Sequence, residues 1–292
     1  ITVQADDSIQ GKGYIDLAIG EIERIEKLIS SWDPASQTSD INRNAGIQPV
    51  QVDDELFGLI ERSLSISRLT DGAFDITYAS MDRIWQFDGT MSAMPDQIAI
   101  RTSVEKAGYA KLRLDPEKKT VFLSEAGMKI GFGGIGKGYA ADQAKALLVK
   151  NGVQAGIINA SGDMNTWGSP PDSDSWRIAI TNPVRKNNVF AMLPLQEGAV
   201  VTSGDYERYV TFNGIRYAHI INPKTGYPAT GIVSVTVLAP KAELADALAT
   251  SVFVMGTEVG LNRINQLPGV ECVIIDEDGQ VFTSDHIKLE RQ

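Results

Sequence analysis

Apolar residues recur with two different periods along this chain, and their alternation predicts an α+β fold. Helical spacing covers residues 14–32, where isoleucines repeat every three or four positions, and residues 243–255, which are apolar on nearly every face. Short β-type runs lie between residues 111 and 283, and the Asn213-Gly214 pair is a strong hairpin signal. Because hairpins outnumber crossovers, we predict mixed and antiparallel sheets packed against helices. The chain of 292 residues is long enough for one domain, residues 1–292, with two lobes that share a core.

Capping and turn residues place the remaining elements. Asp53 or Asp54 can begin a second helix that ends near Gly72, and a third helix is predicted over residues 95–108. Another helix should end at Asn151-Gly152, and residues 31–46 read as a loop. The predicted strands cover residues 111–114, 120–124, 128–132, 155–159, 176–181, 190–195, 209–212, 215–217, 233–238, 272–275 and 281–283.

Charge and composition exclude several classes of partner. The chain has 27 basic and 37 acidic residues, a net charge of −10, which argues against nucleic acid and against an anionic membrane surface. The same charge makes a diphosphate ligand unfavourable unless a metal ion offsets the repulsion. The single cysteine, Cys272, lies in an apolar run and is expected to be a buried strand residue. The chain opens at Ile1 in strand-like sequence, so we expect a segment upstream of it.

A glycine run over residues 131–138 follows a predicted strand and opens a helix. It meets the P-loop and dinucleotide patterns only in part, because Gly138 stands where a P-loop needs Ser or Thr, and no acidic residue follows at the required distance. Backbone without side chains at a helix start lets N–H groups approach an anion. A tight turn with no ligand explains the run equally well.

Two further features are candidates for chemistry. Asp246 and Thr250 are four residues apart on one face of an apolar helix that has no basic residue after Lys241, and such hard oxygen ligands suit magnesium. A hydrogen-bonded structural Asp is the alternative. His219 lies where a strand enters the turn that ends at Gly226, and its imidazole is a candidate general base or a half-buried strand residue. The other histidine, His286, is in a polar segment and should be exposed.

Seven stretches carry these features in a recognisable order. They are Ser39-Asp40-Ile41-Asn42; Gly72-Ala73-Phe74-Asp75-Ile76-Thr77 with Trp85 downstream; Gly131 to Asp142; Asn159-Ala160-Ser161-Gly162-Asp163; Thr202-Ser203-Gly204-Asp205-Tyr206; His219 to Gly226; and Ala245-Asp246-Ala247-Leu248-Ala249-Thr250. Together they resemble the ApbE family, the FAD:protein FMN transferases. The resemblance spans residues 30–256, and it implies transfer of the FMN half of FAD to a Ser or Thr hydroxyl of an acceptor protein, with release of AMP.

The resemblance also implies roles for individual residues. It makes Trp32 the aromatic that packs on the flavin, places Lys137 and Ile221 beside FAD, and makes His219 the catalytic base. The segment Ala73, Phe74 and Asp75 is expected to line the FAD site.

Magnesium is the cofactor that the resemblance implies. Its expected ligands are the backbone carbonyl of Gly134 and the side chains of Asp246 and Thr250. The metal would neutralise the FAD diphosphate while the acceptor hydroxyl attacks the FMN phosphorus.

This chain departs from the family pattern at three positions. Gly131 stands where the family commonly has Asp, Ser161 replaces a usual glycine, and Asn222 precedes Pro223 where the family usually has Asp. Two other functions share the site: hydrolysis of FAD to FMN and AMP, and flavin binding or storage without chemistry, which Asn222 favours. A Rossmann-type oxidoreductase fits less well, because hairpins dominate.

The acceptor and the location follow from the resemblance alone. An acceptor of this family typically exposes a Ser/Thr-Gly-Ala-Ser/Thr segment on a subunit of a membrane redox complex. The expected location is the periplasm or the outer face of the cytoplasmic membrane, with a lipid anchor on a removed N-terminal segment. No nucleic acid partner is expected.

Overall fold

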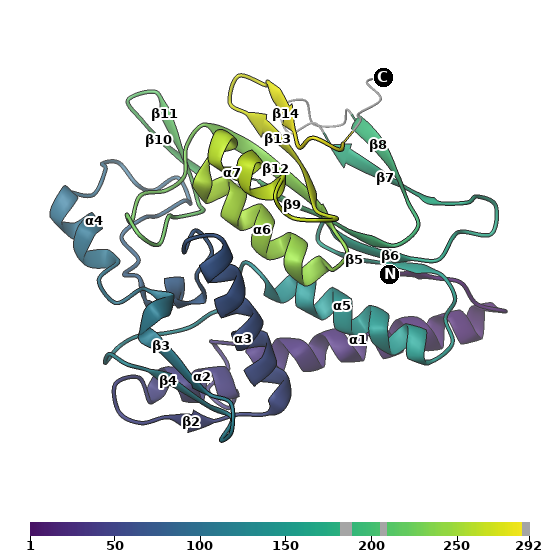
Figure 1. Ribbon diagram of the computed structural model, residues 1–292, viewed down its shortest axis with the longest axis horizontal. Coiled ribbons are helices and arrows are strands. Elements are labelled where there is room, and N and C mark those ends of the chain that lie inside the picture. Colours follow the sequence, from purple (N-terminus) through teal and green to yellow (C-terminus); the bar gives the residue numbers. More distant parts are fainter. Residues whose placement is uncertain (182–188, 205–208, 288–292) are drawn as a thin grey trace.

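The computed structural model describes the chain except for residues 182–188, 205–208 and 288–292. In the described residues, the main sheet has the order β1-β5-β6-β9-β12-β13-β14, with each neighbouring pair antiparallel (Figure 1). The strands are β1 (Thr2–Val3), β5 (Gly156–Ala160), β6 (Asp163–Trp167), β9 (Gly198–Gly204), β12 (Ile232–Ala239), β13 (Glu271–Asp276) and β14 (Val281–Thr283).

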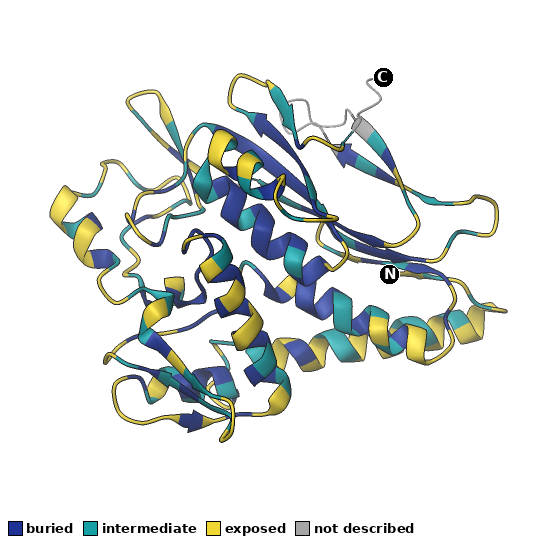
Figure 2. Cartoon of the chain, in the orientation of Figure 1, coloured by how far each residue is buried: buried dark blue, intermediate teal, exposed yellow. Residues whose placement is uncertain are grey.

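Helices pack on one face of this sheet and form the larger core. They are α5 (Gly136–Lys150), α6 (Ala242–Met255) and α7 (Thr257–Ile264), with α1 (Ser8–Ile29) running beside α5 (Figure 1). The apolar helix α6 is buried along most of its length against the sheet and against α5 beside it, as the dark blue ribbon in Figure 2 shows. No helix in the described residues is long and apolar enough to span a bilayer.

A second lobe is built around the amphipathic helix α3 (Asp54–Leu69), which buries one face. It contains α2 (Gln37–Arg43) and a small sheet of β2 (Val50–Gln51), β4 (Thr120–Leu123) and β3 (Leu112–Asp115). Short 3₁₀ helices cover Ile76–Ser80 and Tyr109–Lys111. Side chains from α1, α5 and α6, including Ile25, Tyr139 and Ala247, enter this core, so the two lobes share their helices.

Two hairpins project from the main sheet, β7 (Trp176–Thr181) with β8 (Val189–Leu195), and β10 (Tyr209–Phe212) with β11 (Ile215–Ala218). The second hairpin packs through Tyr217 on Trp85, whose ring lies 5.9 Å away. Trp85 is buried and donates from Nε1 to the carbonyl of Gly226 at 2.8 Å. This contact ties the turn after His219 to the segment that leads to α4 (Gln97–Ser103).

The fold class and most elements agree with the sequence prediction. The Asn213-Gly214 hairpin forms with both turn residues at positive φ, Gly152 ends α5 at φ +88°, and Cys272 is a buried strand residue. His286 is exposed, as expected. The helix predicted over residues 14–32 begins earlier, at Ser8, because Asp7 caps its first turn with 2.8 Å bonds from the Ile9 and Gln10 N–H groups.

Four predictions were wrong or incomplete. The helix predicted over residues 95–108 ends at Ser103, and β6, β9, α2 and α7 were not predicted as elements. Residues 31–46 were expected to be a loop, but Ser36 caps α2 by accepting from the Ser39 N–H at 3.0 Å. The predicted strand at residues 128–132 does not form, because side chains bond the backbone groups of residues 129 and 130.

The start of α6 is capped by a residue from another helix. Asp142 on α5 accepts from the backbone N–H groups of Ala242 and Glu243, each at 3.0 Å, and from Asn165 Nδ2 at 2.5 Å. The first N–H groups of a helix have no partner within the helix, so this carboxylate satisfies two of them. Asp142 therefore fixes the position of the helix that carries Asp246 and Thr250.

We expect Asp142→Ala to destabilise the protein by about 2 to 3 kcal/mol, because two buried N–H groups lose a charged acceptor. Urea unfolding measures the change. Asp7→Ala, which removes the exposed cap of α1, is the matched control and should cost only about 1 kcal/mol. Equal losses in the two variants would contradict a special role for Asp142.

Candidate active site between the two lobes

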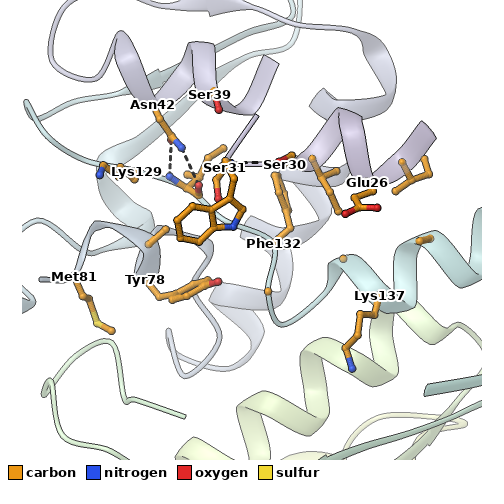
Figure 3. Close-up of a pocket in the computed structure, with 18 of the residues that line it drawn as sticks. Glu26, Ser30, Ser31, Ser39, Asn42, Tyr78, Met81, Lys129, Phe132 and Lys137 are labelled. Atoms are coloured by element: carbon orange, nitrogen blue, oxygen red, sulfur yellow. Dashed lines mark hydrogen bonds between the residues drawn. The ribbon is translucent and has the colours of Figure 1, made fainter. Parts of the chain in front are cut away.

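A cavity of about 1160 Å³ lies where α1, the 3₁₀ helix at Ile76–Ser80, the glycine run and the His219 turn meet (Figure 3). Its lining includes Trp32, Tyr78, Lys137, His219 and Ile221. Four of these were candidates from the sequence, and Tyr78 was not. The cavity is large enough for a dinucleotide-sized ligand.

Trp32 is held outward at the mouth of this cavity. Its side chain is 76% exposed, and the Arg83 guanidinium carbon lies 4.8 Å from the centre of its ring. The turn that presents it is organised by Ser30, whose Oγ accepts from the backbone N–H groups of Trp32 and Asp33 at 3.3 and 3.0 Å. An exposed indole on an ordered turn offers a flat face to a planar ligand.

The segment entering the glycine run is bonded to side chains instead of to a neighbouring strand. Asn42 bonds both backbone groups of Ile130, donating to the carbonyl at 3.1 Å and accepting from the N–H at 2.8 Å, as the dashed lines in Figure 3 show. Ser80 does the same for Lys129, at 2.8 and 2.7 Å. These bonds occupy the groups that a strand ladder needs, which is why no strand forms here.

The glycines allow close approach between elements. A Cβ at Gly138 would lie 2.2 Å from the Ala242 carbonyl oxygen, so α5 and α6 can meet only because the side chain is absent. A Cβ at Gly133 would lie 2.4 Å from the phenol oxygen of Tyr78. Gly131 also faces this region, because a Cβ there would lie 3.2 Å from Ala79, and it therefore leaves little room for a larger side chain.

Asp246, Thr250 and Gly134 come together beside the cavity. A Cβ at Gly134 would lie 3.1 Å from Thr250 Oγ1, and Asp246 is one turn before Thr250 on α6. Asp246 is 3% exposed and accepts from the Gly138 N–H at 3.1 Å. Burial, together with the neighbouring charge of Asp163, raises the pKa of Asp246 to about 7. The cluster lies next to the cavity lining, because Gly133 and Lys137 line the cavity. Gly134 follows Gly133, and Asp246 bonds Gly138, the residue after Lys137.

Lys137 connects the cavity to this buried cluster. It starts on the first turn of α5 and extends away from Phe132 and Tyr78 (Figure 3). Its ammonium forms an ion pair with Asp163, whose side chain is fully buried. Burial raises the pKa of the Asp163 carboxyl, and the charge of Lys137 opposes that rise.

His219 is exposed at the cavity wall, at the start of the turn that ends at Gly226. Asn222 organises that turn: its Oδ1 accepts from the Lys224 N–H at 2.9 Å, and its carbonyl accepts from Thr225 and Gly226. The departure at Asn222 therefore supports the local turn, a task that an Asp would perform equally well. Ile221 follows His219 into the cavity lining.

Ala73, Phe74 and Asp75 are all buried, and none of the three is part of the described cavity lining. Asp75 accepts from the Thr77 N–H and hydroxyl at 2.8 and 2.7 Å, and from the Tyr109 N–H at 2.7 Å. This carboxylate caps the 3₁₀ helix whose later residues, Tyr78 and Ala79, do line the cavity. The segment therefore supports the cavity wall without lining the cavity itself.

The donor set beside the cavity fits a hard cation. In the described part of the chain, no three His, Cys, Asp or Glu side chains are grouped to hold a metal, which disfavours a zinc-type site. Two buried carboxylates, a half-buried hydroxyl and nearby backbone carbonyls are present instead. Oxygen donors of these kinds, with room left for water or phosphate, are what magnesium takes.

Sequence reasoning assigned no role to Tyr78, Arg83 or Asp163. The sequence does contain a signal for Asp163, because this acidic residue directly follows the Ser161-Gly162 pair. In the structure this pair forms a turn in which both residues have positive φ. The position of Tyr78 follows only from its packing on Gly133. The motif residues Asp205 and Tyr206 lie outside the described residues.

The ApbE family model matches residues 1–274 of this chain. A curated relative named FAD:protein FMN transferase, from Treponema pallidum (strain Nichols), is 31% identical over 278 residues, covering 90% of this chain and 77% of that protein. A protein with the same name from Klebsiella pneumoniae (strain 342) is 30% identical over 270 residues, covering 92% of this chain and 84% of that protein.

Solved structures share the fold over nearly the whole chain. The crystal structure of the ApbE protein of Thermotoga maritima superposes with a TM-score of 0.86 and 34% identity, covering 96% of this chain and 92% of that chain. The flavin transferase ApbE from Vibrio cholerae superposes with a TM-score of 0.84 and 26% identity, covering 97% of this chain and 92% of that chain.

Proposed function

This chain belongs to the ApbE family and is a flavin transferase, and we propose that it moves FMN from FAD to a Ser or Thr hydroxyl of an acceptor protein in a magnesium-dependent reaction that releases AMP. The observation that carries the proposal is the arrangement around one cavity. The buried Asp246 and the half-buried Thr250 lie against the glycine run at the edge of the cavity, and the exposed imidazole of His219 lies on the cavity wall.

The cavity offers separate places for the parts of FAD. Trp32 at the mouth presents an exposed aromatic ring for the isoalloxazine, and the Arg83 guanidinium carbon lies 4.8 Å from the centre of the indole ring. Lys137 and the glycine run line another part of the cavity, beside the Asp246 carboxylate that would hold magnesium. The diphosphate would lie at this end, where an ammonium and backbone N–H groups can face it.

Asp246, Thr250 and the Gly134 carbonyl would hold the magnesium ion. Bound there, magnesium would offset the charge of the FAD diphosphate, which an acidic chain otherwise repels. Asp142 positions this pair by capping the start of α6. Catalysis would then come mainly from positioning and charge stabilisation.

His219 is the proposed proton acceptor. The acceptor hydroxyl oxygen bonds to the FMN phosphorus while the phosphoanhydride bond to AMP breaks, and AMP leaves with the electron pair of that bond. The hydroxyl proton passes to the His219 imidazole and then to solvent. An exposed position on the cavity wall suits this role, because the acceptor is a protein segment that must reach the site from outside.

Mass spectrometry of an acceptor domain tests the proposal. The protein is incubated with FAD, MgCl₂ and a domain that exposes a Ser/Thr-Gly-Ala-Ser/Thr segment, with and without EDTA. Magnesium-dependent addition of FMN to the acceptor, with equimolar AMP, is the expected result. Free FMN and AMP with an unmodified acceptor would instead make the protein a FAD hydrolase, and FAD recovered intact would make it a flavin-binding protein.

We expect Gly133→Ala to weaken FAD binding by about tenfold, because the added methyl group overlaps the Tyr78 hydroxyl and displaces the cavity wall. Quenching of flavin fluorescence measures the dissociation constant. Tyr78→Phe in the same chain should restore most of the affinity, since the phenol oxygen is the atom within 3 Å of the new Cβ. Gly20→Ala, in open space on α1, is the matched control.

The acceptor and the location remain part of the proposal. We propose an acceptor subunit of a membrane redox complex, modified in the periplasm or at the outer face of the cytoplasmic membrane. The net charge of −10 supports recognition of a protein segment over nucleic acid.

A further inference from the structure

Asp163 is a buried carboxylate that the proposed mechanism does not use. It is the first residue of β6, and its side chain is 0% exposed. Its charged partner is the Lys137 ammonium, which contacts Oδ2. A fully buried carboxylate is costly unless it is paired, so this contact has to be stabilising.

The same ammonium also acts on Asp246. Asp246 lies next to this ion pair, because its Oδ2 accepts from the N–H of Gly138, the residue that follows Lys137, at 3.1 Å. The charge of Asp163 raises the pKa of Asp246, and the charge of Lys137 opposes that rise. The three side chains come from three elements that pack together, β6, α5 and α6. Among the described residues, Lys137 is the cation that acts on both buried carboxylates, and its single charge is one short of neutralising them when both are ionised.

We propose that Asp163 belongs to the cation site, and that the Lys137 ammonium is its counter-ion in the metal-free protein, which the divalent cation displaces. The inference rests on the proposed magnesium site at Asp246 and Thr250. A divalent cation matches the total charge of the two carboxylates. It would compete with the ammonium for them, because two cations that contact the same carboxylate repel each other. Lys137 can leave, since its side chain is 49% exposed and flexible.

The displaced ammonium has a use in the reaction. Lys137 lines the cavity, so a lysine released from Asp163 can turn towards an anionic ligand there. Occupation of the cation site would thus make a positive charge available to the diphosphate. Lys137 acts in this scheme as a positioning residue that reports whether the cation is bound.

Isothermal titration calorimetry with MgCl₂ alone, without FAD, tests the exchange at pH 8. Lys137→Met should tighten magnesium binding by about tenfold or more, because the competing cation is gone. Asp163→Asn should weaken it by about tenfold, because one carboxylate is lost and Lys137 remains near Asp246. Lys150→Met, an exposed lysine at the far end of α5, is the control for net charge and should stay within about twofold of the wild type.

The opposite directions separate this exchange from a structural defect, because a poorly folded variant would only lose affinity. Lys137→Gln provides a second neutral variant, and circular dichroism checks the folding of each. Equal or weaker magnesium binding in both neutral variants overturns the exchange but leaves the proposed cation site in place. Absence of magnesium binding in the wild-type protein overturns the cation site and this inference together.

Discussion

Asp246→Asn is expected to reduce FMN transfer by at least about 1,000-fold and to remove detectable magnesium binding, because the amide cannot supply the negative charge that a hard cation needs. The site is small: beyond Asp246 it offers a hydroxyl from Thr250, a carbonyl from Gly134 and the ion-paired Asp163. Loss of its central carboxylate cannot be offset by these groups. Calorimetry with MgCl₂ and the acceptor assay measure the two effects.

The same substitution should stabilise the metal-free fold. Burial raises the pKa of Asp246 to about 7, far above its unfolded value of 3.8, so the folded protein loses stability as pH rises between these two values. At pH 8 the Asp246 carboxylate is ionised in the folded protein, and its burial lowers the free energy of unfolding. Asn has no charge to bury, so the substitution removes this destabilisation. Thermal unfolding should show a higher midpoint for Asp246→Asn without metal, and a smaller gain on adding MgCl₂.

Glu243→Gln is the matched control for this prediction. It removes one negative charge from a buried position on the same helix, where Glu243 pairs with Arg62 at 2.6 Å on the side of α3. Magnesium binding should persist in this variant. Wild-type magnesium affinity in Asp246→Asn would contradict the assignment of the cation site to α6.

His219→Ala is expected to slow FMN transfer by at least about 100-fold, since no other imidazole is among the described residues that line the cavity. FAD binding should change little, because His219 is exposed on the cavity wall, while the proposed contacts to FAD are made by Trp32 and Lys137 elsewhere in the lining. Single-turnover transfer and fluorescence titration of FAD separate the two quantities.

His286→Ala is a suitable control for the loss of His219, because it removes the other histidine of the chain from an exposed position. Asn222→Asp adds a further measurement. The turn at residues 222–226 should survive, since a carboxylate can also accept from the Lys224 N–H. A faster transfer in this variant would show that a carboxylate assists His219; transfer at the wild-type rate in His219→Ala would remove His219 from the mechanism.

Local patterns were sufficient for the elements whose stability is local. The Asn213-Gly214 turn, the Gly152 cap and the apolar helix around residues 243–255 each depend on residues within a few positions of one another. The expected strand at residues 128–132 has equally good local character. It fails to form because Asn42 and Ser80, distant in sequence, bond its backbone groups.

The candidate site shows the same division. Motif resemblance pointed to Trp32, Lys137 and His219, and these do line one cavity. It also pointed to Ala73, Phe74 and Asp75, which the structure buries behind that wall. Residue type and order do not say on which side of a wall a side chain lies, because that depends on packing between distant segments.

The sequence by itself determined the α+β class, the family and the candidate polar pair on α6, because periodicity, turn residues and motif order are properties of neighbouring positions. Only the tertiary structure decided what surrounds that pair. Three contacts around the site join residues that are 26 to 101 positions apart: Lys137 with Asp163, Asp142 with the start of α6, and Tyr78 with Gly133. No local sequence pattern links the two residues of any of these contacts. Burial and charge act through space, so the chemistry of the site follows from packing that no local pattern encodes.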